Sequence, residues 1–91
     1  MNKTRRGILS KKVEELETLK SQLEDIKSEI EDVHSNEEDA FDALPESLQD
    51  SERGQMMQEN IDSLDDAFSN LDDIISNVDD VIDLLNEVIE R

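Results

Sequence analysis

A seven-residue unit repeated near the end of the chain decides the fold: residues 64–70 read LDDAFSN, 71–77 read LDDIISN and 78–84 read VDDVIDL. Apolar residues within and around these repeats recur at alternating spacings of three and four. This average period of 3.5 residues keeps one apolar stripe facing a partner helix, as positions a and d do in the coiled-coil heptad abcdefg. The repeat therefore predicts a long helix that packs lengthwise against another helix.

The predicted seam of this helix alternates between positions d and a: Met57, Ile61, Leu64, Phe68, Leu71, Ile75, Val78, Ile82, Leu85 and Ile89. The neighbouring g column is apolar at every position except the first: Asn60, Ala67, Ile74, Val81 and Val88. A stripe three columns wide is broader than one partner helix covers and is typical of helix bundles. We therefore expect an all-α protein, a long antiparallel helical hairpin that pairs as a homodimer into a four-helix assembly.

The composition is that of a small, strongly acidic domain. The chain has 91 residues, 26 of them acidic and 9 basic, and a formal net charge of −17. With 34% hydrophobic residues, a single hairpin buries little surface, so self-association is expected to add stability. The acidic balance speaks against direct binding of nucleic acid through its phosphates. It fits a solvated surface or a basic protein partner.

Three further features of the sequence bear on membrane association, on cysteine chemistry and on cellular location. No apolar run approaches the length of a membrane span, so no membrane association is expected. The absence of cysteine excludes disulfides and cysteine-based metal sites. The basic start MNKTRRGILSKK lacks the apolar segment of a signal peptide, which predicts a cytoplasmic location in the cell that makes the protein.

Residues 1–9 are predicted to form a basic tail, and Ser10 is the expected N-cap of a first helix over residues 10–43. Its predicted seam also has spacings of three and four: Leu16, Leu19, Leu23, Ile26, Ile30 and Val33. The lysines between these residues are expected to form weak pairs with glutamates of the same helix: Lys20 and Lys27 with Glu17, Glu24 and Glu31. Glu37 interrupts the seam, and residues 35–38 resemble a capping box. A continuous helix is favoured, and a restarted one stays open.

Pro45 ends the first helix, because the residue before a proline avoids the helical conformation. The expected joint covers residues 44–50, and Asp50 or Ser51 is the expected N-cap of a second helix over residues 51–90. Two long helices with a short joint fold back antiparallel.

The returning chain has two further expected features. Gly54, in the first turn of the second helix, permits a close approach of the backbone. The antiparallel arrangement also brings the basic start of the chain near its acidic end. Ion pairs of low strength are therefore expected there, from Arg5, Arg6, Lys11 and Lys12 to Glu87 and Glu90.

The sequence of the joint is similar to that of a known family of proteins. Residues 41–54, FDALPESLQDSERG, followed by residues 61–67, IDSLDDA, resemble small acidic helical-hairpin (coiled-coil) proteins of bacteriophages, prophages and Gram-positive bacteria. The resemblance extends over nearly the whole chain, and its specific part is the joint LPESLQDSERG. It implies a phage or mobile-element source and a non-enzymatic accessory role, and it supplies no catalytic residues.

Pairs of adjacent aspartates occupy positions e and f of the second helix, on the side expected to lie opposite the seam: Asp65, Asp66, Asp72, Asp73, Asp79 and Asp80. Carboxylates one heptad apart lie about 10 Å apart along a helix, too far to share one ion. His34 is the only histidine and lacks partners for a metal site or a catalytic triad. We expect no catalytic, cofactor-binding or metal-binding residues and no enzyme activity.

Two functional classes fit these features. The first is a self-associating coiled-coil module for protein–protein interaction. The second is an acidic mimic of DNA that inhibits a basic host nucleic-acid-binding or defence protein, as anti-CRISPR and anti-restriction proteins do, and that uses the aspartate pairs as its partner face. Acidic helical surfaces commonly serve solubility alone, which favours the first class.

Overall fold

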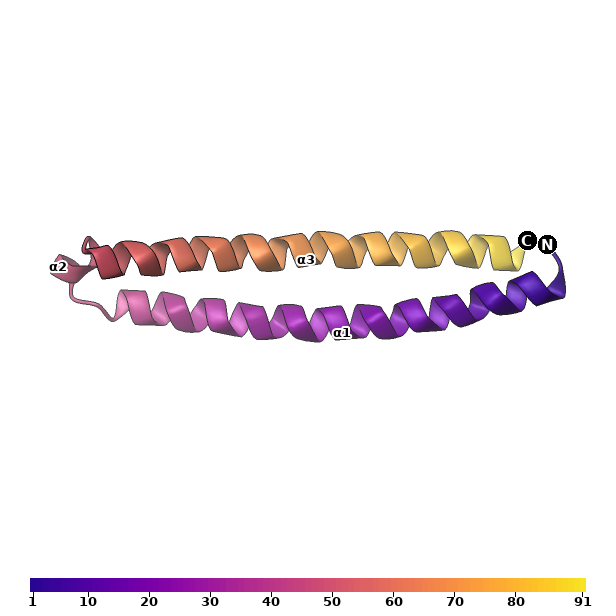
Figure 1. Cartoon of the computed structure of the whole chain (residues 1–91), viewed down its shortest axis with the longest axis horizontal. Helices are drawn as coiled ribbons and strands as arrows, with labels where there is room; N and C mark the ends of the chain where they lie inside the picture. The colour runs from indigo at the N-terminus through magenta and orange to yellow at the C-terminus, as the bar shows by residue number, and fades with distance from the viewer.

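Two long helices run side by side in opposite directions (Figure 1). In the computed structural model, which describes all 91 residues, α1 comprises Lys3–Asp42, the short α2 comprises Glu46–Gln49, and α3 comprises Glu52–Glu90. The resulting rod measures 68 × 15 × 14 Å. Both chain termini lie at one end, and α2 lies at the other (Figure 1). The predicted all-α antiparallel hairpin is confirmed.

The first helix begins at Lys3, and the expectation of a tail over residues 1–9 is wrong. The side chain of Asn2, not that of Ser10, is the N-cap: it accepts a hydrogen bond of 2.8 Å from the backbone N–H of Arg5. Asparagine is among the strongest N-capping residues because its side-chain oxygen satisfies a free N–H group of the first turn. The helix therefore already includes the basic residues of the chain's start.

The polar residues at the expected interruption have partners, and α1 is continuous through residues 35–38. Glu37 is half-buried and accepts a hydrogen bond of 2.9 Å from the side-chain amide of Asn60 on α3. The ring of His34 lies edge-on to that of Phe68, with 5.1 Å between the ring centroids. These contacts with α3 allow polar side chains to occupy the seam without breaking the helix.

Side chains of the joint close both helix ends that meet there. The amide nitrogen of Gln49 donates to the backbone carbonyls of Phe41, at 3.5 Å, and Leu44, at 3.3 Å. Carbonyls at the end of a helix have no partner within it, so Gln49 satisfies groups at the end of α1. Ser51, one of the two predicted N-caps, begins α3 and accepts a hydrogen bond of 3.2 Å from the N–H of Gly54.

The seam of α3 consists of the residues that its heptads predict. None of the ten predicted seam residues is exposed. Six residues of the whole chain are buried, and they belong to this seam, to α1 and to the first turn of α3: Val13, Gly54, Met57, Ile61, Ile75 and Ile82. Because each long helix has a single neighbour, the core is one narrow strip along the rod.

The seam of α1 differs from the predicted one. Apart from Glu31 at position e, its buried and half-buried residues occupy positions a and d: Arg6, Leu9, Val13, Leu16, Lys20, Leu23, Lys27, Ile30, His34, Glu37 and Phe41. Three predicted seam residues, Leu19, Ile26 and Val33, are instead exposed at position g. The helix is turned so that the column containing Lys20 and Lys27, rather than the g column, faces α3. In this rotation each lysine pairs with an aspartate of α3, and Val13 and Phe41 of the same column also lie in the interface.

Candidate functional site

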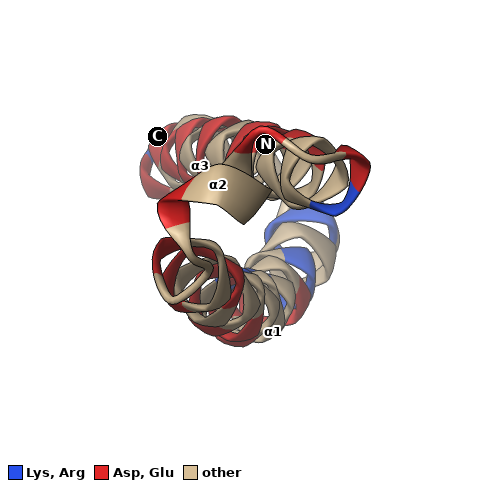
Figure 2. Ribbon diagram, turned by 90° about the vertical axis from the view of Figure 1, so that its left-hand side faces the viewer, with Lys and Arg blue, Asp and Glu red and all other residues tan.

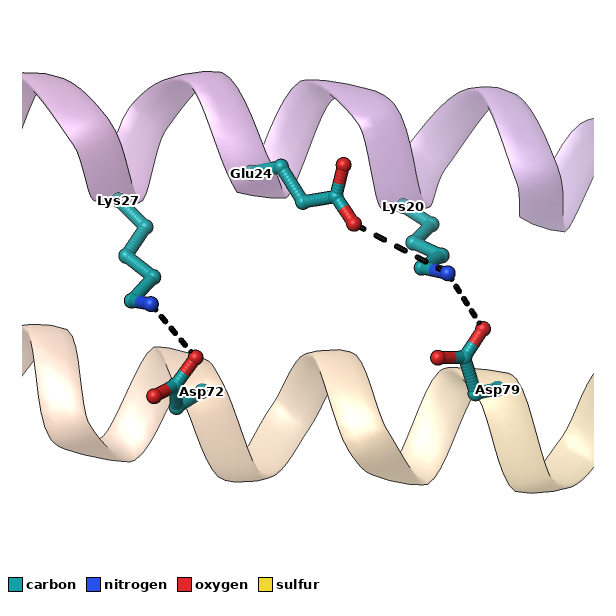
Figure 3. Close-up of polar contacts among 5 residues, drawn as sticks. All are labelled: Lys20, Glu24, Lys27, Asp72 and Asp79. Carbon is teal, nitrogen blue, oxygen red and sulfur yellow. Dashed lines mark ion pairs between the residues drawn. The ribbon is translucent and has the colours of Figure 1, made fainter.

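Two lysines of α1 reach across the seam to α3 (Figure 3). Lys20 Nζ lies 2.7 Å from Asp79 Oδ1 and 3.9 Å from Glu24 Oε1. Lys27 Nζ lies 2.7 Å from Asp72 Oδ1. These ion pairs join the middle of α1 to the middle of α3.

The same arrangement changes the titration of both lysines. Lys27 also lies 3.3 Å from Glu31 Oε1 of its own helix. The pKa of Lys20 is raised above 10.5, mainly by its hydrogen bond to Asp79, and the pKa of Lys27 is raised mainly by its hydrogen bond to Asp72. The aliphatic stems lie half-buried in the seam, while the ammonium groups stay at its edge, as long basic side chains commonly do.

These ion pairs show which columns of the two helices lie on the same side. Lys20 occupies position a of α1, and its two carboxylate partners, Glu24 and Asp79, occupy position e of α1 and α3. One ammonium group can bind both only if the two e columns lie together beside the seam. We call this side the acidic side, defined by Glu17, Glu24, Glu31, Asp65, Asp72 and Asp79. The two g columns then lie together on the other side of the seam.

The apolar side, as we call the second surface, consists of these g columns and the adjoining c columns. Every large apolar side chain that α1 and α3 leave exposed lies in them: Ile8, Leu19, Ile26, Val33, Met56, Ile74, Val81 and Leu84. Their exposed fractions range from 42% to 60%. Scattered exposed apolar residues are ordinary, whereas a one-sided stripe is typical of an interaction surface.

The apolar side also contains few charges. Its g and c columns within α1 and α3 hold only two of the 26 acidic residues, Glu15 and Glu29, together with the basic residues Arg5, Lys12 and Arg53. Elsewhere acidic residues line both long helices, as the view along the hairpin shows (Figure 2). The apolar side is thus the surface that carries almost none of the net charge of −17.

The predicted partner face of aspartates divides into two sets. Asp72 and Asp79 lie beside the seam and hold the lysines, so their expected place on the opposite side is wrong. Asp65 occupies the same column and is exposed. The remaining three, in the f column, are exposed on the back of α3: Asp66, Asp73 and Asp80.

Ion pairs at the terminal end of the rod stay within single helices. Lys12 pairs with Glu15 at 3.0 Å, and Arg91 pairs with Glu87 at 3.9 Å. The expected pairing across the helices is therefore wrong for this end, although the two termini do lie close together (Figure 1). Lys11 and Lys12 occupy positions f and g, which face away from the acidic column of α3. No cross-helix ion pair forms for the expected set of Arg5, Arg6, Lys11 and Lys12 with Glu87 and Glu90.

The remaining candidate features are a pocket, a metal site, the single histidine and a membrane-spanning stretch. The surface contains no pocket, and no three His, Cys, Asp or Glu side chains are grouped so that they could hold a metal ion. His34 lies against Phe68 in the seam, with its Nδ1 atom 2.9 Å from Glu38 Oε1. Neither long helix contains an apolar stretch that could cross a membrane.

The sequence interpretation missed that Lys20 and Lys27 belong to the seam. A signal for this was present in their spacing. Val13, Lys20, Lys27, His34 and Phe41 recur every seven residues, in phase with the d-position leucines. A heptad position filled by charged residues can still face the partner helix, because a lysine stem is apolar and its ammonium can reach a flanking acid.

The chain matches no protein-family model, no curated protein and no solved structure. Function is therefore inferred from the two sides of the hairpin.

Proposed function

We propose that the protein is a non-enzymatic coiled-coil interaction module that associates with a second copy of itself through the apolar side. The observation that carries the proposal is the one-sided distribution of exposed apolar residues. All eight lie in the g and c columns of the two long helices, and the b, e and f columns contain none. This distribution favours a four-helix assembly in which two apolar sides face each other.

The energetics support such an association. The hairpin alone buries only 6 of its 91 residues, and a core this thin gives little stability. Full burial of a Leu or Ile side chain contributes about 1.5–3 kcal/mol, so covering a half-exposed one gains roughly half as much. Summed along the rod, these gains oppose the repulsion between two acidic chains. The low charge of the apolar side keeps that repulsion small at the contact.

The direct test is the mass of the protein in solution. Sedimentation equilibrium or light scattering at micromolar concentration is expected to give twice the chain mass of 10.4 kDa, with high helix content by circular dichroism. A fully helical protein with the mass of a single chain would contradict the proposal.

A matched pair of variants locates the contact. Replacing Ile26 and Ile74 with Asp places two charges on the apolar side and is expected to abolish the dimer. Replacing Ser28 and Ser76 with Asp adds the same charge at exposed b positions and should leave the dimer intact. Equal behaviour of both variants would show that the added charge, not the apolar side, governs association.

An acidic mimic of nucleic acid is the second candidate. The exposed f column of α3 favours it, and so does the resemblance to phage and prophage hairpins. Asp72 and Asp79 of the e column are paired with lysines. The surface that mimics DNA would therefore centre on the f column alone rather than on the e and f columns together. A basic host protein would then bind quickly and in competition with DNA.

The test of mimicry removes the charge of the f column without touching the seam. Asp66, Asp73 and Asp80 are replaced with Asn, and binding to a basic partner captured from the host is measured with and without duplex DNA. Mimicry requires weaker binding of the variant and displacement of the native protein by DNA. A partner that stays bound in both experiments rules it out.

A further inference from the structure

The two ends of the hairpin carry opposite charge. Residues 1–13 and 84–91, at the terminal end, contain six basic and two acidic side chains, a formal charge of +4. Residues 36–60, at the joint end, contain eight acidic side chains and one basic one, a formal charge of −7. The charge of the 68 Å rod is therefore asymmetric along its long axis, although the molecule as a whole is acidic.

We infer that two copies pair through their apolar sides with their long axes reversed, so that the terminal end of one lies beside the joint of the other. This inference rests on the proposed self-association and adds the orientation of the second copy. Closed homodimers have twofold symmetry, and for two rods in face-to-face contact the axis is either parallel or perpendicular to the rods. A parallel axis places like ends together, and a perpendicular axis places opposite ends together.

Charge decides between the two arrangements. With like ends together, the two +4 ends meet and the two −7 ends meet, so both contacts are repulsive. With reversed rods, each +4 end meets a −7 end, so both contacts are attractive. A second copy thus supplies the complementary charge for each end, which identifies a suitable occupant for the apolar side. The charges lie near the surface, so the preference is strongest at low ionic strength.

The apolar residues of α1 are compatible with the reversed arrangement. Leu19, Ile26 and Val33 follow one another at intervals of seven in the g column, so they are symmetric about Ile26. A perpendicular axis near Ile26 places Leu19 of one copy opposite Val33 of the second. It also places Lys12 at the level of residues 39–42 of the second copy, where two aspartates lie.

The orientation can be measured with a single spin label per chain, because the protein has no cysteine of its own. Ser10→Cys places a label near the terminal end, at an exposed position e away from the apolar side. In reversed dimers two such labels are separated by about 50 Å, from the helical rise of 1.5 Å per residue. With like ends together they lie within about 25 Å, the width of two helix layers. Pulsed dipolar spectroscopy at low ionic strength distinguishes these values.

Ser28→Cys is the matched control, because this exposed residue lies near the expected axis. Its labels should be separated by about 25 Å in the reversed dimer. A long distance for Ser10→Cys with a short one for Ser28→Cys supports the inference. Short distances for both overturn the orientation and leave the proposed self-association intact. A monomer mass and no dipolar coupling would overturn the self-association itself.

Discussion

Gly54 lies directly against the backbone carbonyl of Gln49: a Cβ atom on Gly54 would overlap that oxygen and would lie 2.7 Å from the carbonyl oxygen of Leu48. The expectation that glycine permits a close approach of the returning chain is thus confirmed. Gln49 in turn donates to the carbonyl of Phe41 in the last turn of α1 and to that of Leu44 just beyond it. The joint is therefore a compact unit in which the end of α1, α2 and the first turn of α3 depend on one another.

Gly54→Ala is expected to destabilise the hairpin. The added methyl group meets backbone rather than a flexible side chain, so α2 must move away from α3 and the Gln49 hydrogen bonds weaken. Overpacking of this kind typically costs about 1–3 kcal/mol. The free energy of unfolding, measured in urea at fixed protein concentration, should fall by this amount.

Gly7→Ala is the matched control for this substitution. Gly7 lies within α1 and has nothing within 4 Å of an added Cβ. Alanine in a helix interior is favoured over glycine by up to about 1 kcal/mol, so this variant should be slightly more stable. Equal effects of the two substitutions would contradict the close approach at the joint.

The start of α1 gives a second prediction. Asn2→Ala removes the N-cap, which typically costs about 0.5–2 kcal/mol of helix stability, and should speed amide hydrogen exchange over the first turn. Ser10→Ala replaces a serine inside the helix with a better helix former and should not speed this exchange. The reverse result would mean that the helix begins after Ser10.

The raised pKa values of Lys20 and Lys27 predict a loss of stability in alkali. The folded pKa of each lysine lies above the ordinary value of 10.5. Their contribution is therefore fully present below pH 10.5 and is lost as the pH rises through the folded pKa. The chain contains no Tyr and no Cys, so few other side chains titrate in this range. Melting temperatures measured from pH 8 to pH 12 should therefore fall above pH 10.5.

Substitution separates this effect from the general repulsion of a highly charged chain. Replacing Lys20 and Lys27 with Gln should flatten the alkaline part of the profile. Replacing Lys3 and Lys11 with Gln, which changes the net charge equally but removes no cross-helix ion pair, should keep it. A profile that is the same in both variants would mean that the two seam lysines do not control alkaline stability.

Adjacent isoleucines of α3 give a prediction about its rotation. Ile75 is buried in the seam, with 9% exposure, whereas Ile74 is 46% exposed on the apolar side. Ile75→Asp places an unpaired charge in the core, which is strongly destabilising, and should abolish most of the helix signal in circular dichroism. Ile74→Asp should lower the association constant and retain most of the helix signal. Loss of structure only in the Ile74 variant would mean that the seam is assigned to the wrong column.

Much of the hairpin could be predicted from the sequence, because the features that define it are local or strictly periodic. The seam of α3 follows from ten apolar residues spaced without interruption at positions a and d, whereas the neighbouring g column begins with Asn60 and Ala67 and the neighbouring e column is rich in aspartate. The joint follows from Pro45, which disfavours helix before it, and from Ser51, which caps the next helix. The same strict spacing predicted the apolar g column of α3, with Ile74 and Val81, beside its seam.

The rotation of α1 was decided only by the tertiary structure. Its sequence offers two columns beside the d-position leucines, one with Leu19, Ile26 and Val33 and the other with Lys20 and Lys27, and local propensity does not distinguish them. The choice depends on what α3 presents: its aspartates flank the seam and bind lysines placed at position a. Once α1 is turned to make these ion pairs, its g column lies beside that of α3. The sequence by itself therefore determined a hairpin with spare apolar residues, while packing of the two helices gathered those residues on one side.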